Sequence, residues 1–262
     1  MTTGSGHCSQ QNHRIYAKYI KRGIDIAVSC CMLLLTAPIN LVLALLTYKD
    51  VGSPIFFRQE RIGKRGEVFT LVKFRNMTND VDDQGCLLPP EERVTRFGKI
   101  MRASSLDELF NFWSILKGDM SLIGPRPLLP EYQGLWSDDH LTRLKVRPGL
   151  ECPNIEGNVF DCSWEEQFNN DSWYAQNVSF VVDARLFIRL VAAVFDKQRT
   201  KARGSDDRGY FIGYWDGVAV NEHDFPNWRE CRPLFPAREH WTREEAMLLV
   251  RSHEEKSECE DK

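Results

Sequence analysis

A single long apolar run dominates the pattern of hydrophobic and polar positions along the chain. It extends from Ile24 to Tyr48, is apolar on nearly all sides of a helix, and exceeds the roughly 20 residues needed to cross a bilayer core. Pro38 lies at its middle, where it removes one backbone donor, and the polar Asn40 follows closely. The pattern predicts a helix, a break and a second helix over residues 21–50.

Basic residues flank this run on both sides. Lys18, Lys21 and Arg22 precede it and Lys49 follows it. Because the positive-inside bias does not place the two ends on opposite sides of a membrane, we expect a re-entrant hairpin that enters and leaves by the same face. A buried core helix is the alternative interpretation. A signal peptide is disfavoured, because a polar segment of about twenty residues precedes the run.

The rest of the chain alternates short strand-like and helical patterns. Two segments rich in β-branched and aromatic residues, 54–58 and 68–75, flank a turn signal at 63–66 and predict a β-hairpin. Helical patterns follow at about 91–102, 105–117 with Gly118 as its C-cap, 130–145, 163–177 and 181–198. The predicted fold class is therefore α/β, mostly α-helical with a small β-hairpin or sheet.

The helix predicted at 181–198 is amphipathic and basic. Leu186 and Leu190 lie on one stripe, while Arg185 and Arg189 lie outside it. A helix of this kind packs on a protein core or lies on the cytosolic surface of a membrane, and the apolar run elsewhere in the chain favours the membrane.

Charge and composition change between the two ends of the chain. We divide the chain into an N-terminal segment 1–20, a membrane hairpin 21–50, a main domain 51–204 and an acidic accessory lobe 205–262. Residues 1–75 hold 11 Lys and Arg against 4 Asp and Glu, whereas residues 206–262 hold 8 against 14. A capped helix is predicted from Thr242 in the acidic part. The basic segment beside an apolar run suits anionic lipid headgroups better than nucleic acid.

The composition excludes several classes of protein. Hydrophobic residues make up 42% of the chain, which is enough for a packed core and argues against global disorder or a fibre. The eight cysteines include no C-x-x-C pair, so neither a zinc ribbon nor a disulfide framework is indicated. Reduced thiols in a protein that faces the cytosol are the simplest interpretation.

Two adjacent carboxylates stand out at the predicted start of the helix 105–117. Ser105 and Glu108 have the spacing of a capping box, in which Ser105 caps the helix and Glu108 reaches back to the Ser105 amide. The same helix start favours an ionised Asp107 and can hold an anion. If Arg102 and Arg126 gather nearby, the two carboxylates could bind a divalent cation and bring a diphosphate to one of them.

A series of motifs follows in a fixed order over about residues 20–200: Lys21-Arg22-x-x-Asp25, the apolar run with its central proline, Lys73-Phe-Arg75, Phe97-Gly-Lys-x-x-Arg102, Ser105-Leu-Asp-Glu-Leu109, Leu116-Lys-Gly-Asp-Met-Ser121, Gly124-Pro-Arg-Pro127 and Arg147-Pro-Gly149. In order and spacing, this series resembles the monotopic polyprenol-phosphate phosphoglycosyl transferases, the bacterial sugar transferase family.

The resemblance implies an enzyme at the cytoplasmic face of the bacterial inner membrane. Such an enzyme transfers a phospho-sugar from a UDP-sugar to a polyprenol phosphate, here expected to be undecaprenyl phosphate, and releases UMP. By resemblance, Asp107 is the nucleophile that forms a phospho-sugar aspartyl intermediate, and Glu108, together with Asp107, binds Mg²⁺. Ping-pong kinetics would follow. Expected partners are membrane lipids, a second copy of the chain or later glycosyltransferases, and no nucleic acid.

The resemblance also implies a set of substrate-binding residues: Lys73, Arg75, Arg102, Pro125, Arg126, Arg147 and Asp183. Arg102 is the expected partner of the lipid phosphate, and Arg126 is the candidate for the nucleotide side, because a guanidinium pairs with phosphate in a bidentate manner. Lys73 and Arg75 alternate along a predicted strand and are expected to share a face. Structural salt bridges, or pairing of Asp183 with a helix dipole, are the alternatives.

The sequence departs from the family pattern at three places. Ala37 precedes Pro38 where serine is common, Asn76 replaces threonine after Lys73-Phe-Arg75, and residues 151–158 differ from the usual Thr-Gly-Trp-x-Gln-Val-x-Gly. The last difference motivates an alternative function, a catalytically inactive membrane scaffold for glycan-assembly enzymes.

Overall fold

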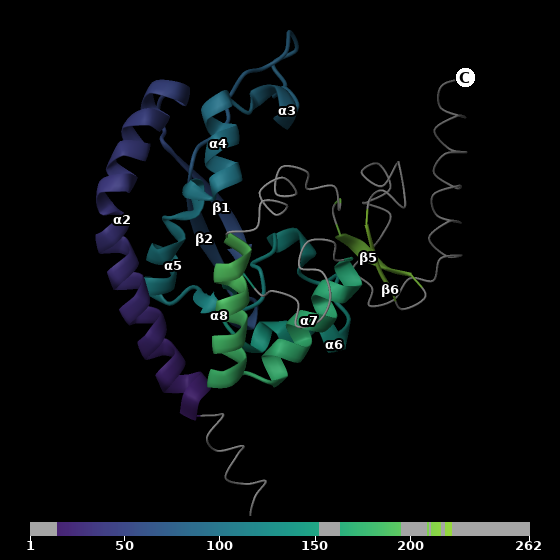
Figure 1. Ribbon diagram of the computed structural model, residues 1–262. Helices are drawn as coiled ribbons and strands as arrows, with labels where there is room; N and C mark the ends of the chain where they lie inside the picture. Colours follow the sequence, from purple (N-terminus) through teal and green to yellow (C-terminus); the bar gives the residue numbers. More distant parts are fainter. Residues whose placement is uncertain (1–14, 152–162, 195–208, 210, 216–217, 222–262) are drawn as a thin grey trace, which may run out of the picture.

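The computed structural model describes residues 15–151, 163–194, 209, 211–215 and 218–221. Its helices and strands follow a π-helical turn at Tyr16–Ile20 and are α2 Lys21–Val51, β1 Phe56–Ile62, β2 Val68–Phe74, α3 Pro90–Arg93, α4 Arg96–Ser104, α5 Asn111–Lys117, β3 Ser121–Ile123, α6 Asp138–Leu141, β4 Gly149–Glu151, α7 Trp164–Gln176, α8 Phe180–Val194, β5 Phe211–Trp215 and β6 Val218–Asn221. Short 3-10 turns lie at Lys64–Gly66, Leu106–Glu108, Pro130–Tyr132 and Thr142–Lys145. Figure 1 shows α2 along one side of the molecule, with α6, α7, β5 and β6 on the opposite side.

The apolar run forms one helix, so the predicted break at Pro38 is not observed. Helix α2 continues through Pro38 and is bowed along its length (Figure 1). A proline removes a single ladder bond, here the one to the Leu34 carbonyl, and the rest of the helix is kept. Next to it, the Thr36 hydroxyl donates to the Met32 carbonyl over 2.7 Å, and the Asn40 side-chain amide donates to Thr36 Oγ1 over 3.2 Å.

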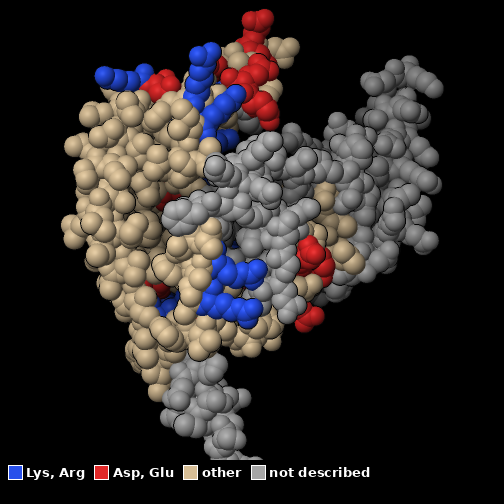
Figure 2. All heavy atoms as spheres, viewed as in Figure 1, with Lys and Arg blue, Asp and Glu red and all other residues tan. Residues whose placement is uncertain are grey.

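The burial pattern of α2 is the reverse of a soluble core helix. Its buried residues are mostly polar and include Asp25, Ser29 and Thr47, whereas Leu34 is 77% exposed and Leu41 is 64% exposed. The helical segment Tyr16–Val51 is long and apolar enough to cross a membrane, and only 17% of its most apolar window is buried in the protein. Figure 2 shows that the side of the molecule formed by α2 carries few charged side chains. These features contradict a buried core helix.

Helix α8 also exposes apolar side chains. Phe180, Val181 and Ile188 are 59%, 74% and 68% exposed. Its other face is buried through Leu186 and Asp183. A helix in this part of the chain is therefore confirmed up to residue 194, where the described part of α8 ends, and both its buried and its exposed sides carry apolar side chains.

The predicted β-hairpin is confirmed. Strands β1 and β2 pair antiparallel from Phe56 opposite Phe74 to Ile62 opposite Val68. Gly63 opens the turn between them, and a side chain there would lie 2.9 Å from the Glu67 carbonyl. The hairpin therefore needs glycine at this position.

Three predicted helices are interrupted. The segment 105–117 divides into the 3-10 turn Leu106–Glu108 and α5. The segment 91–102 divides into α3 and α4, because Thr95 caps α4 by accepting from the Gly98 amide. The segment 130–145 contains two 3-10 turns and the short helix α6 that begins after Ser137. Pro130 at the start and Gly134 at positive φ prevent a continuous helix there. Helix α7 is confirmed and begins with a capping box between Ser163 and Glu166.

Three hydrophobic clusters join these elements. The first links β2, α5, β3, α7 and α8, and the third links α2, β2 and α4. In the second cluster, Phe211 and Tyr214 of β5 pack with Trp164 and Phe168 of α7, and the Ala219 amide of β6 donates to Glu165. The described part of the predicted C-terminal lobe therefore shares a core with the preceding domain. The helix predicted from Thr242 and the divergent segment 151–158, apart from Glu151 at its start, lie outside the described residues.

A parallel pair of short strands brings two loops into close contact. Ser121 and Ile123 of β3 pair with Gly149 and Glu151 of β4. A side chain on Gly149 would lie 2.2 Å from the Gly124 amide nitrogen, so both glycines are required by the close approach of the two backbones.

We expect Gly149→Ala to destabilise the protein by about 1–3 kcal/mol, because backbone atoms on both sides must move to admit the new methyl group. Thermal unfolding measures the effect. Gly23→Ala in α2 is the matched control, since a side chain there meets no atom within 4 Å. Equal melting temperatures for the two variants would contradict the close approach of β3 and β4.

Candidate active site

Ser105 adopts the left-handed backbone conformation and directs the chain into the turn that carries Asp107 and Glu108. Helix α4 ends at Ser105, which has φ 57°, and the chain then turns into the 3-10 turn Leu106–Glu108. The predicted capping box is wrong: the Ser105 side chain caps no helix, and Glu108 pairs with Lys73 instead of the Ser105 amide. The left-handed conformation is uncommon for a residue with a side chain, and such strained residues gather at functional sites.

Asp107 is buried in this turn with 7% of its surface exposed. Burial is the largest effect on its pKa and raises it above the usual range of an aspartate, and the neighbouring charge of Glu108 raises it further. Lys73 and Arg102 act in the opposite direction. The side-chain nitrogen Nδ2 of Asn76 donates to Asp107 Oδ2 over 3.2 Å. A buried carboxylate with a raised pKa and nearby cations is typical of an active-site group.

Lys73 links strand β2 to the carboxylate pair. Its Nζ lies 2.6 Å from Glu108 Oε1, and both side chains are partly exposed. Arg75 does not share this environment: its guanidinium donates to the Val51 carbonyl at the end of α2, and its amide donates to the Ile55 carbonyl. The predicted common face is lost because β2 ends at Phe74, after which the strand alternation no longer applies.

The carboxylate pair lies against the apolar helix. Leu106 and Leu109, which flank the pair, pack on a cluster that contains Leu43 of α2, Phe74 of β2 and Met101 of α4. The same elements that bury Asp107 therefore connect it to the helix that exposes an apolar surface. Arg102 lies in the last turn of α4 and is exposed, close enough for its charge to lower the pKa of Asp107.

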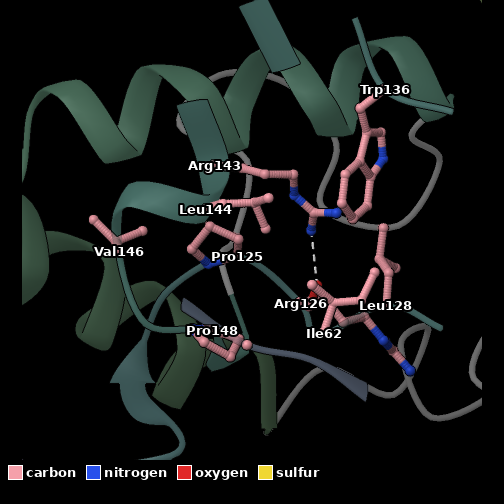
Figure 3. Close-up of a pocket in the computed structure, with 10 residues that line it drawn as sticks. Ile62, Pro125, Arg126, Leu128, Trp136, Arg143, Leu144, Val146 and Pro148 are labelled. Carbon is pink, nitrogen blue, oxygen red and sulfur yellow. Dashed lines mark hydrogen bonds between the residues drawn. The ribbon is translucent and has the colours of Figure 1, made fainter. Parts of the chain in front are cut away.

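The loop after β3 carries Pro125 and Arg126. Pro125 is buried and Arg126 is exposed. The guanidinium of Arg143 donates to the Arg126 carbonyl over 2.8 Å, and Figure 3 shows the Arg126 side chain pointing away from Arg143. A small pocket beside this loop is lined by Ile62, Gly63, Pro125, Arg126, Leu128, Trp136, Arg143, Leu144, Val146 and Pro148.

Arg147 makes a structural contact. Its Nε donates to the Gly118 carbonyl over 2.8 Å, and Arg22 bonds the preceding carbonyls of Ile115 and Leu116. These bonds satisfy the C-terminal end of α5, which stops at Gly118 in the left-handed conformation as predicted.

Asp183 lies in a buried polar network. One carboxylate oxygen accepts from Tyr16 and Lys21, each over 2.7 Å, and the other accepts from Tyr174 over 2.6 Å. The network ties α8 to the start of α2 and to α7. This arrangement favours a structural role over the predicted contact with substrate.

We expect Asp183→Asn to lower the free energy of unfolding by about 3 kcal/mol, because Lys21 would remain buried without an opposite charge. Thermal unfolding and the KM of the remaining active enzyme measure the effect. Asp119→Asn is the control, because its pair with the exposed Lys117 should contribute less than about 1 kcal/mol. Unchanged stability together with a raised KM would contradict a structural role and indicate substrate binding.

The carboxylate pair suits Mg²⁺ when a diphosphate is also bound. In the described part of the chain, no group of three or more His, Cys, Asp or Glu side chains lies together as a metal site. Mg²⁺ commonly binds one or two carboxylates and takes its remaining ligands from water and substrate phosphates. Asp107 and Glu108 provide two adjacent carboxylates whose mutual repulsion a cation would relieve. These two residues therefore fit the predicted ion.

Two features of the site were missed in the sequence. In the sequence, Asn76 differs from the family pattern only by the exchange of one polar residue for another, and nothing in the sequence predicts its contact with Asp107. The buried ion pair of Arg143 with Asp171, 2.9 Å apart, had no signal at all, because the two residues are distant in sequence.

Comparisons with known proteins identify the family to which the sequence is similar. A profile of the family described as "Bacterial sugar transferase" matches residues 16–197. The chain is 40% identical to "Uncharacterized sugar transferase EpsL" of Bacillus subtilis over 67% of the chain and 87% of that protein. It is 32% identical to "UDP-N-acetylgalactosamine-undecaprenyl-phosphate N-acetylgalactosaminephosphotransferase" of Aeromonas hydrophila over 69% of the chain and 44% of that protein.

A third relative, "UDP-glucose:undecaprenyl-phosphate glucose-1-phosphate transferase" of Caulobacter vibrioides, is 36% identical over 52% of the chain and 53% of that protein. The chain thus spans about half the length of these two relatives with named substrates, and most of the length of the Bacillus relative. The family profile covers the apolar helix α2, the carboxylate pair Asp107 and Glu108, and α8. The chain belongs to the bacterial sugar transferase family.

Proposed function

We propose that the protein transfers a phospho-sugar from a UDP-sugar to a polyprenol phosphate, with undecaprenyl phosphate as the expected acceptor. The observation that carries this proposal is a buried carboxylate, Asp107, in a turn that packs against an exposed apolar helix. A reaction between a water-soluble anion and a lipid phosphate needs a nucleophile at the boundary between protein and membrane. The names of the Aeromonas and Caulobacter relatives support both substrate classes.

The reaction proceeds in two half-reactions. In the first, an oxygen of Asp107 attacks the phosphorus that carries the sugar, and the bond between that phosphorus and the bridging oxygen breaks. UMP leaves with the bridging oxygen and its electron pair, and the phospho-sugar remains on Asp107. In the second, an oxygen of the polyprenol phosphate attacks the same phosphorus and releases the Asp107 carboxylate. The two half-reactions give ping-pong kinetics.

Three cationic residues are proposed to bind the phosphates, of which Lys73 and Arg102 act on Asp107 and Arg126 lies in the loop after β3. Lys73 is paired with Glu108 and is proposed to neutralise the donor diphosphate. Arg102 is exposed at the end of α4 and is the proposed partner of the lipid phosphate, while Arg126 is the proposed partner of the nucleotide. When Mg²⁺ is bound by Glu108 and Asp107, it supplies charge that neutralises the diphosphate and stabilises the departing UMP.

We also propose that the protein is monotopic at the cytoplasmic face of the bacterial inner membrane. Basic residues near both ends of α2 support entry and exit by the same face, although α2 is one continuous helix, and its exposed leucines supply the surface that faces lipid. Helix α8, with its exposed Phe180 and Ile188, would lie at the interface. Labelling of single cysteines at either end of α2 with a membrane-impermeant reagent tests this. We expect neither end to be labelled in intact spheroplasts and both ends to be labelled after permeabilisation, and labelling of one end in intact spheroplasts would contradict re-entry.

The activity is tested with the detergent-solubilised full chain, Mg²⁺, a polyprenol phosphate and a panel of UDP-sugars. We expect UMP release from one or a few donors and a lipid-linked diphospho-sugar as product. No UMP from any donor, with a folded and lipid-bound protein, would contradict the proposal and favour the scaffold function.

A further inference from the structure

Asn76 contacts the proposed nucleophile directly. Its side-chain nitrogen donates to Asp107 Oδ2 over 3.2 Å. An ionised carboxylate has no proton to donate, so the amide nitrogen, and not the amide oxygen, must face Asp107. The bond fixes the rotation of the carboxylate and turns Oδ1 away from Asn76.

The backbone of Asn76 is itself held in place. A side chain on Gly98 of α4 would lie 2.1 Å from the Asn76 carbonyl oxygen, so α4 packs directly on this peptide group. On the next residues, Met77 forms an isolated antiparallel bridge with Val94, and the Thr78 amide donates to the Arg93 carbonyl over 2.9 Å. Asn76 is therefore a fixed point between the end of β2 and the start of α4.

The charged groups around Asp107 leave a distinct task for Asn76. The negative charge of Glu108 repels the Asp107 carboxylate, whereas the positive charges of Lys73 and Arg102 attract it. Asn76 adds a neutral donor at a defined distance. It occupies the position where the family that the sequence resembles commonly has threonine, which also carries a side-chain donor.

We propose that Asn76 is a positioning residue that holds the Asp107 carboxylate so that Oδ1 faces the phosphorus of the donor. This inference rests on the proposed function. In the step that it assists, Oδ1 forms a bond to the sugar-bearing phosphorus, the bond from that phosphorus to the bridging oxygen breaks, and the electron pair leaves on UMP. The Asn76 proton stays on its nitrogen, and Asn76 acts through Asp107 without touching the donor.

The main test compares Asn76→Asp with Asn79→Asp. Both variants change an asparagine to aspartate in the segment between β2 and α3, but the side chain of Asn79 is exposed. The readouts are the single-turnover rate of UMP release without polyprenol phosphate, the KM of the UDP-sugar and the melting temperature. We expect Asn76→Asp to slow UMP release by at least about 100-fold, because a like-charged oxygen replaces the donor, with KM changed by less than about threefold. The Asn79→Asp control should keep the wild-type rate.

A second pair keeps the test decisive if the aspartate variant folds poorly. Asn76→Thr and Asn76→Val have nearly the same shape, and only threonine can donate a hydrogen bond. We expect the valine variant to release UMP roughly 10-fold more slowly than the threonine variant at equal melting temperature.

The outcomes separate this inference from the proposed function. A wild-type rate for Asn76→Asp, or equal rates for the threonine and valine variants, would overturn the positioning role alone. A wild-type protein that releases no UMP from any donor would overturn the proposed function together with it.

Discussion

Asp107→Asn is expected to abolish turnover, with a fall of about 10⁴-fold or more in the rate of UMP release. The reason is direct: an amide cannot attack phosphorus to form the intermediate, while the size and the burial of the side chain are kept. The rate is measured with the donor that the wild type uses best. Asp83→Asn, which changes an exposed aspartate, should keep full activity. Turnover by Asp107→Asn within about tenfold of wild type would show that Asp107 is not the nucleophile.

The same substitution is expected to stabilise the fold at neutral pH. Burial raises the pKa of Asp107 in the folded protein above its value in the unfolded chain. As the pH rises between these two values, the unfolded chain loses its proton first, so the free energy of unfolding falls and stays lower at neutral pH. Asp107→Asn removes this cost. Its melting temperature should exceed that of the wild type at pH 7.5, by about 2–4 °C for each kcal/mol recovered, and the difference should shrink near pH 4. A lower melting temperature at pH 7.5 would contradict the burial of an unfavourable charge.

Glu108→Gln is expected to cause the second-largest loss, roughly 10²–10³-fold in turnover. The substitution keeps the shape of the side chain and removes the charge that pairs with Lys73 and that is proposed to bind Mg²⁺. Initial rates over a titration with MgCl₂ should show that the variant needs more Mg²⁺ for half of its maximal rate. The melting temperature should change little, because the partly exposed pair contributes less than about 1 kcal/mol.

The control for this variant is Glu67→Gln, which removes the charge of an exposed glutamate beside the hairpin turn. It should leave both the rate and the Mg²⁺ dependence unchanged. If Glu108→Gln shows the same Mg²⁺ dependence as this control, Glu108 does not bind the ion.

The local parts of the fold were predictable from sequence because nearby residues determine them. The hairpin β1–β2 has β-branched and aromatic strands around a glycine turn, and the helix predicted at 163–177 is observed as α7. Gly118 ends α5 in the left-handed conformation that glycine adopts readily. The parallel pair β3–β4 was not predicted, because three-residue strands distant in sequence have no periodic pattern to reveal them.

One error arose where tertiary contacts override local preference. Ser105 and Glu108 have a capping spacing, but the chain reverses at Ser105 and Glu108 turns to Lys73 of β2. That outcome cannot be read from a short window of sequence. A second error concerns Pro38, which has the properties of a helix breaker, yet α2 continues through it at the loss of one backbone hydrogen bond.

The candidate site was predictable in part. The resemblance identified Asp107 and Glu108, and the structure places Lys73 and Arg102 near them. The resemblance could not show which charged residues stabilise the fold rather than contact substrate. Asp183 is one such residue, because it bonds two tyrosines and a lysine. That distinction depends on burial and on partners that lie far apart in the chain.

The most direct test of the central claim is to trap the intermediate. The full chain is incubated with Mg²⁺ and a UDP-sugar labelled with ³²P on the sugar-bearing phosphate, without polyprenol phosphate, and the labelled peptide is then identified. We predict one stoichiometric label on Asp107, together with one equivalent of UMP, that is discharged when polyprenol phosphate is added. Label on another residue, or turnover with acceptor but no label without it, would contradict a covalent intermediate on Asp107.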